Sequence, residues 1–93
     1  NGQLAYQVTY VGDNKQGVEK QWYDNGNPKS EKTYKDNTLN GPYVTYYDNG
    51  KKEEQCAYKM GQLEGKKTYW LRSGRKKSEA TYENGEMVSG RVF

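Results

Sequence analysis

The 93-residue chain has no histidine and no isoleucine, and it has only one cysteine and one phenylalanine. The lack of histidine removes the commonest general base and the commonest metal ligand. The single cysteine, Cys56, excludes a disulfide within the chain and has no neighbouring metal ligands. Nucleophilic catalysis by Cys56 would need a base beside it, and none is predicted there. We therefore expect no catalytic site, no metal and no cofactor, and we classify the protein as a non-enzyme.

Long apolar runs and strong charge are also absent. No segment approaches the ~20 apolar residues of a membrane span, and no signal peptide is visible at the start. The net charge of +3, from 15 basic and 12 acidic residues, is well short of the positive field expected of a dedicated nucleic-acid binder. We therefore expect no nucleic-acid partner.

Aromatic residues are plentiful, and one recurs at every twelfth position. Glycines mark a period twice as long: Gly2, Gly26, Gly50 and Gly74 are spaced by 24 residues, and the first three follow asparagine. A regular period of this size indicates an array of small repeated units. The aromatic series consists of Tyr10, Trp22, Tyr34, Tyr46, Tyr58, Trp70 and Tyr82.

The period divides the chain into one repeat domain over residues 1–93. We expect a partial unit at 1–16, full units at 17–40, 41–64 and 65–89, and a C-terminal stub at 90–93. The last full unit holds one extra residue in its final loop. A chain that starts in mid-repeat can belong to a longer array, whose exposed end strands would be open to edge-to-edge self-association.

Each unit predicts a β-hairpin followed by a connector. In the first full unit, extended segments flank Asp24-Asn25-Gly26, and a looser turn follows Tyr34. Asn-Gly favours a type I′ turn, so Gly26, Gly50 and Gly74 are predicted to be structural turn residues. Hairpins need neighbours to be stable in water. The predicted fold is therefore all-β: an elongated, solenoid-like single antiparallel sheet of tandem 24-residue hairpins.

Side-chain alternation predicts the two faces of this sheet. A two-residue turn at Asn25-Gly26 would place Tyr23 opposite Pro28. The more apolar face, which we assign to the core, would then hold Val8, Tyr10, Tyr23, Tyr34, Thr45, Tyr47, Cys56, Tyr58, Tyr69, Leu71, Ala80 and Tyr82. The opposite face would carry a column of Trp22, Tyr46 and Trp70. A bulge in the turn would exchange the two faces.

The unit resembles the MORN repeat variant, a family found in many bacterial proteins, some of them antitoxin-like. The resemblance rests on the turn Tyr46-Tyr47-Asp48-Asn49-Gly50, on Tyr58, which closes the second strand, and on the connector Gly61-Gln62-Leu63-Glu64-Gly65. The first and third full units depart from it, with Trp22 and Trp70 at the first turn aromatic. The resemblance implies an elongated antiparallel sheet and a binding or scaffolding role. It leaves the compartment open between bacterial cytoplasm and cell envelope.

The candidate interaction surface combines aromatic and basic residues. Trp22, Tyr46 and Trp70 form its aromatic column, and the basic residues near the turns are Lys51, Lys52, Arg72, Arg75, Lys76 and Lys77. Stacked side by side, they would make one edge positive and attract anionic groups. The alternative is structural: thin sheets need aromatic rings for packing, and lysines on a rim keep a sheet soluble.

The predicted function is a non-catalytic scaffold for protein interaction, antitoxin-like if the family resemblance extends that far. Its expected partner is an unidentified protein, because aromatic and basic residues supply most interface energy. The alternative is an envelope ligand binder, for anionic lipid headgroups, choline or a glycan, that uses the aromatic rows and the basic rim.

Overall fold

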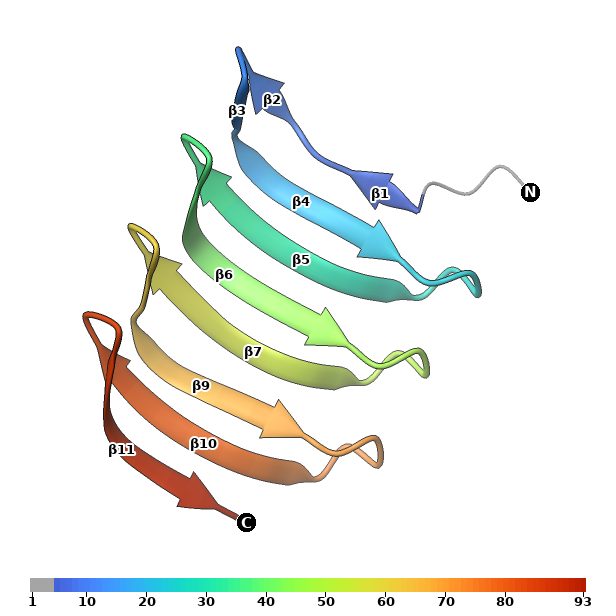
Figure 1. The fold of residues 1–93 in the computed structure, drawn as a ribbon. Helices are drawn as coiled ribbons and strands as arrows, with labels where there is room; N and C mark the ends of the chain where they lie inside the picture. The colour runs from blue at the N-terminus through green and yellow to red at the C-terminus, as the bar shows by residue number, and fades with distance from the viewer. Residues whose placement is uncertain (1–4) are drawn as a thin grey trace.

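The computed structural model describes residues 5–93, so the predicted marker Gly2 lies outside the described residues. Every regular element in this range is a β-strand (Figure 1). The strands are β1 (Tyr6–Gln7), β2 (Tyr10–Val11), β3 (Asn14–Lys15), β4 (Gly17–Trp22), β5 (Pro28–Lys35), β6 (Thr38–Tyr46), β7 (Lys52–Lys59), β8 (Gln62–Leu63), β9 (Gly65–Trp70), β10 (Lys76–Glu83) and β11 (Glu86–Val92).

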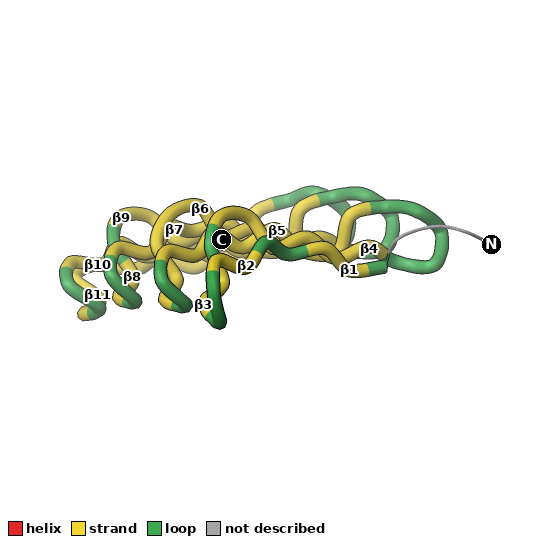
Figure 2. Tube along the Cα trace, turned by 90° about the horizontal axis from the view of Figure 1, so that it is seen from above, coloured by secondary structure: helices red, strands yellow, loops and turns green. Residues whose placement is uncertain are grey.

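One antiparallel sheet contains most of these strands, in the order β1-β4-β5-β6-β7-β9-β10-β11. The short strand β8 pairs with β7, and β2 and β3 form a small separate hairpin. The principal extents are 41 × 33 × 10 Å, and the edge-on view shows a single layer (Figure 2). The predicted all-β fold, an elongated antiparallel sheet of tandem hairpins, is confirmed.

The turns after Trp22 and Tyr46 differ from the predicted type I′ geometry. The Tyr23 N–H donates to Asn27 O at 2.9 Å, and the Gly26 N–H donates to Tyr23 O at the same distance, which encloses three residues. Gly26 has φ of 90°, whereas Asn25 is not among the described residues with positive φ. This is the pattern of a three-residue loop with a glycine bulge, which needs positive φ at one position only. The type I′ assignment was wrong here.

Type I′ geometry occurs at the other end of the hairpins, where we had expected a looser turn. Asp36 and Asn37 both have positive φ, at 51° and 70°, and they join Lys35 to Thr38 in a two-residue loop. Met60–Gly61 and Asn84–Gly85 repeat this conformation. Two-residue loops of this type match the right-handed twist of the strands they join. The connectors are therefore the tight hairpin turns of the array.

The register in the middle of the strands follows the predicted alternation. Gln21 pairs with Ser30 and Glu19 with Lys32, as a two-residue turn would give, but Trp22 then pairs with Pro28. The shift between the last two pairs compensates for the extra turn residue. The two predicted faces therefore survive the change of turn. We call them the tyrosine face, with Tyr34, Tyr43, Tyr58, Tyr69 and Tyr82, and the tryptophan face, with Trp22, Tyr46 and Trp70.

The tyrosine face is not a covered core. Among residues 5–93, only Glu19, Ser30, Cys56 and Thr68 are buried, and the register places the first three on this face. Tyr10 and Leu71, which we had assigned to the core, are 55% and 44% exposed. The reason is that a single layer has no second sheet or helix above it. Burial comes only from neighbouring side chains on the same face.

Contacts between units recur with the repeat at the connector end. Oxygen atoms of the Gln16, Asn40 and Glu64 side chains accept hydrogen bonds from the backbone N–H groups of Asp36, Met60 and Asn84, at 2.8, 2.9 and 3.0 Å. Each bond joins one unit to the next, and each satisfies a turn N–H that has no ladder partner. The stack is therefore stabilised at its edge as well as by strand pairing.

Candidate interaction surface

Six side chains near the hairpin turns lie in order across the strands of the tryptophan face. Trp22 pairs with Pro28, Tyr46 with Lys52, and Trp70 with Lys76, so that a ring alternates with a proline or a lysine. We call this set the aromatic row. Successive rings are two strands apart, which corresponds to ~9.6 Å. The three predicted aromatic residues are therefore brought together on one face.

The three rings of the row are partly exposed to solvent. Trp22, Tyr46 and Trp70 are each half-buried. Burial, and then the negative charge of Glu31, raise the pKa of Tyr46, so the phenol stays neutral at physiological pH. The Lys52 ammonium lies 6.0 Å from the centre of the Trp70 ring, at the outer limit of a cation–π contact. The Lys52 ammonium, which also donates to Gln55 Oε1 at 3.1 Å, thus lies near one ring of the row.

A shallow concavity of about 450 Å³ continues the row beside Trp70. Thr68, which is only 6% exposed, lines it together with Pro42 and Ala57. The Lys76 ammonium lies 2.9 Å from Glu79, and its hydrogen bond holds the pKa of that carboxyl below its usual range. Lys76 is therefore paired, and its charge is partly compensated within the chain.

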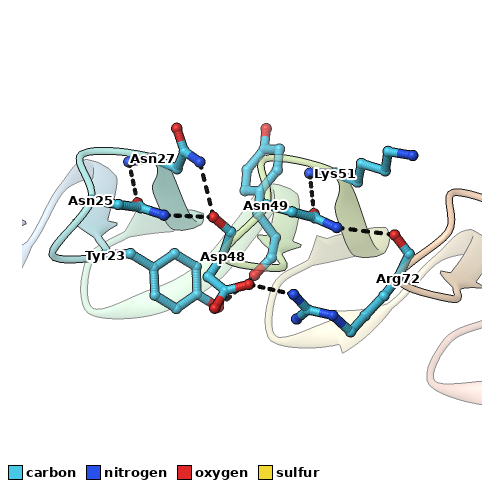
Figure 3. Close-up of polar contacts among 8 residues, drawn as sticks. Tyr23, Asn25, Asn27, Asp48, Asn49, Lys51 and Arg72 are labelled. Atoms are coloured by element: carbon cyan, nitrogen blue, oxygen red, sulfur yellow. Dashed lines mark hydrogen bonds and ion pairs between the residues drawn. The ribbon is translucent and has the colours of Figure 1, made fainter.

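Hydrogen bonds between the turns hold the row in place. The Tyr23 hydroxyl donates to Tyr46 O at 2.7 Å, and the Tyr47 hydroxyl donates to Trp70 O at 2.6 Å. The Asn25 side-chain amide donates to Asp48 O at 2.8 Å, as Figure 3 shows. Each unit therefore binds the backbone of the next through its turn. The spacing of the rings is set by these contacts together with strand pairing.

The six predicted basic residues fall into two groups. Arg72 and Lys76 are paired with acids: the Arg72 guanidinium lies 2.6 Å from Asp48 and 5.3 Å from the centre of the Tyr47 ring. The hydrogen bond to Asp48 raises the pKa of Arg72. Within residues 5–93, the others form no ion pair; these are Lys51, Lys52, Arg75 and Lys77. Four of the six cations are therefore uncompensated.

Charge is distributed unequally between the two long edges of the sheet. The turn edge, formed by residues 22–29, 46–53 and 70–77, carries seven basic and three acidic residues. The connector edge, at residues 11–16, 35–40, 59–64 and 83–89, carries three basic and five acidic residues. Figure 1 shows the two sets of loops at opposite ends of the strands. The edge beside the aromatic row therefore carries an excess of positive charge, and the opposite edge carries an excess of negative charge.

The negative connector edge was not predicted, although the sequence contains its signal. Acidic residues recur in the connectors, namely Asp13, Asp36, Glu64, Glu83 and Glu86. Among charged residues, the predicted interaction surface included only the basic ones near the turns. Summing charge separately over the two kinds of loop would have revealed the opposite edge.

The structure gives little support for chemistry at Cys56. The thiol is 6% exposed, and burial raises its pKa to about 11, so it is protonated at physiological pH.

The described residues contain no group of three or more metal-ligating side chains. In the same part of the chain, no helix is long and apolar enough to cross a membrane.

Comparison with known proteins adds a family match. The family model described as MORN repeat variant matches residues 15–36 and 39–60. Each matched segment begins near the first strand of a hairpin, includes its turn and ends near the following type I′ turn. No curated protein matches the chain.

Proposed function

We propose that this chain, which belongs to the MORN repeat variant family, is a protein-binding scaffold that acts through the aromatic row and the turn edge. Repeats of this family are generally associated with binding proteins or membrane lipids. The observation that carries the proposal is the position of the row. Its rings lie on one face, beside the edge that holds the excess positive charge. If the bound partner is a toxin, the scaffold would act as an antitoxin.

The composition of this surface supports protein binding. Aromatic residues and arginine are enriched at protein interfaces, where a few buried anchors supply most of the energy. The surface is preorganised by the Tyr23 and Tyr47 hydroxyl bonds, so little freedom would be lost on binding. MORN repeats are in general non-catalytic, and the buried, protonated Cys56 thiol fits such a role.

The proposal is tested by affinity capture with two double variants. Trp22→Ala/Trp70→Ala removes the outer rings of the row. Tyr10→Ala/Tyr69→Ala is the matched control, because both tyrosines are exposed and lie outside the row. We expect the control and the unmodified protein to capture the same protein and the row variant to lose it. Equal capture by all three folded proteins would place the binding surface elsewhere.

Anionic lipid is the second candidate, favoured by the charge difference between the edges. Tryptophan and tyrosine beside lysine and arginine is the composition found at membrane interfaces. The test is co-sedimentation with vesicles of phosphatidylcholine, with and without phosphatidylserine. Binding that needs phosphatidylserine and disappears at high ionic strength would favour lipid. Binding of choline or a glycan would instead persist at high ionic strength, and it would quench tryptophan fluorescence.

A further inference from the structure

The aromatic row has two intervals between successive rings on the tryptophan face, and we call these intervals slots. Pro28 lies between Trp22 and Tyr46, and Lys52 lies between Tyr46 and Trp70. The slots recur every two strands, or ~9.6 Å, along the direction in which the units stack. A ligand that fills both must present side chains at this interval while running across the strands.

A polyproline II helix has this interval. It has three residues per turn and rises ~3.1 Å per residue, so every third side chain returns to the same face after ~9.3 Å. A β-strand does not fit in this way, because its side chains alternate and every third one points to the opposite face. The row spans about four strand spacings, or ~19 Å, which about seven polyproline II residues would cover.

The basic residues of the turn edge determine which charge the ligand should carry between its prolines. Lys52 lies between the strands of Tyr46 and Trp70, and its ammonium donates to Gln55 Oε1 at 3.1 Å. Lys51, Arg75 and Lys77 lie at the same edge without ion pairs in the described residues. A basic segment would be repelled by the excess positive charge of the turn edge. An acidic segment would be attracted, and the carboxylates between its prolines would reach these cations.

On this basis, and resting on the proposed function, we propose that the aromatic row binds an acidic polyproline II segment with proline at every third position. Prolines three residues apart occupy the slot over Pro28 and the slot over Lys52. Glutamate or aspartate residues between them pair with the uncompensated cations of the turn edge. Proline rings stack on aromatic side chains in other recognition grooves of this kind, and the preformed helix loses little entropy on binding.

The test uses synthetic peptides and the intact chain. The probe is Glu-Pro-Glu-Glu-Pro-Glu-Glu-Pro-Glu, and binding is followed by calorimetry and by the fluorescence of Trp22 and Trp70. We expect one-to-one binding with Kd below about 100 µM that weakens as salt is raised. A peptide of the same composition with its three prolines contiguous should bind at least about tenfold more weakly. A peptide with lysine in place of glutamate should not bind.

Strand β7 offers matched variants, since Lys52 and Lys59 stand at its two ends and both are exposed. Lys52→Glu should weaken binding of the acidic peptide by about tenfold or more, whereas Lys59→Glu, on the connector edge, should change it by less than about twofold. Equal effects of the two variants would overturn the inference, because binding would then report net charge alone.

Further outcomes separate this inference from the proposed function. Equal binding of the periodic and the contiguous-proline peptides, or no binding of either, would overturn the polyproline II proposal. If the row-dependent protein partner is still captured, the scaffold function stands with a partner of another shape. Binding of phosphatidylserine vesicles without peptide binding overturns the inference in favour of a lipid surface.

Discussion

The Tyr47 hydroxyl donates a hydrogen bond to the Trp70 carbonyl oxygen at 2.6 Å, across 23 residues of sequence. The same contact joins Tyr23 to the Tyr46 carbonyl oxygen one unit earlier. In both cases the tyrosine belongs to one unit and the acceptor is a member of the aromatic row in the next. The bond therefore couples the stability of the array to the position of its candidate binding residues.

Replacing Tyr47 with phenylalanine should test this coupling. The change keeps the ring but leaves the part-buried Trp70 carbonyl without this donor, which costs about 1 kcal/mol. Urea unfolding followed by circular dichroism would measure the loss. Tyr10→Phe is the control, because Tyr10 is 55% exposed, and it should cost less than about 0.5 kcal/mol. Equal losses in the two variants would show that the Tyr47 bond contributes nothing of its own.

The fold followed from periodicity. Aromatics at every twelfth residue and Asn-Gly pairs at every twenty-fourth gave the strand order and the middle register, including the pairing of Gln21 with Ser30. These features depend on local alternation and on short loops, both of which are visible in one sequence. The placement of Trp22, Tyr46 and Trp70 on one face followed for the same reason.

The geometry of the turns could not be predicted in this way. Asn-Gly suits both a type I′ turn and a glycine-bulge loop. Here the Asn25 side chain accepts a hydrogen bond from the Asn27 N–H at 2.9 Å and donates to Asp48 O in the next unit. The neighbouring unit therefore helps to select the loop, and that contact is not encoded in the dipeptide itself.

The burial of the Glu19 carboxylate could not be predicted from the sequence either. Glu19 is 3% exposed, although acidic residues are expected at the surface. The Lys15 ammonium and the Tyr6 hydroxyl each lie 2.7 Å from its carboxylate, and together they compensate for its burial. Tyr6, Lys15 and Glu19 lie in three different strands, so their meeting depends on the assembled sheet.

Two glycines with positive φ should respond differently to the same substitution. Gly17→Ala meets no atom within 4 Å and should cost only the backbone strain of φ at 91°, about 1–2 kcal/mol. Gly41→Ala adds a contact at 3.0 Å with the Thr33 methyl group, which should raise the cost by about 1–3 kcal/mol. Thr33→Ser removes that methyl and should recover part of the loss in a double-mutant cycle. Equal costs at the two glycines would contradict this account.

Cys56 should react slowly with thiol reagents in the folded protein. Burial raises its pKa to about 11, so at pH 8 almost none of the thiol is ionised, and the sulfur is also shielded. The rate of labelling by a chromogenic disulfide should rise by more than about tenfold in denaturing urea. Fast labelling in the absence of urea would show that the sheet around Cys56 opens readily or that the thiol is exposed.

The buried Glu19 should make the protein sensitive to acid. Although burial favours the protonated acid, hydrogen bonds from Lys15 and Tyr6 outweigh it and hold the pKa of Glu19 below its usual range. A carboxyl whose pKa is lower in the folded state stabilises the protein above its unfolded pKa of ~4.3, and this contribution disappears as pH falls through the folded value.

Glu19→Gln should therefore destabilise the protein by about 1–3 kcal/mol at pH 7, because the Lys15 and Tyr6 donors lose their charged acceptor. The difference from the unmodified protein should shrink steadily below about pH 4. Urea unfolding at pH 7, 5, 4 and 3 would measure it, with the exposed Glu83→Gln as a control that shows little difference at any pH. A gap between Glu19→Gln and the unmodified protein that stays constant down to pH 3 would mean that the Glu19 charge makes no contribution, and that the variant acts only through the packing of its side chain.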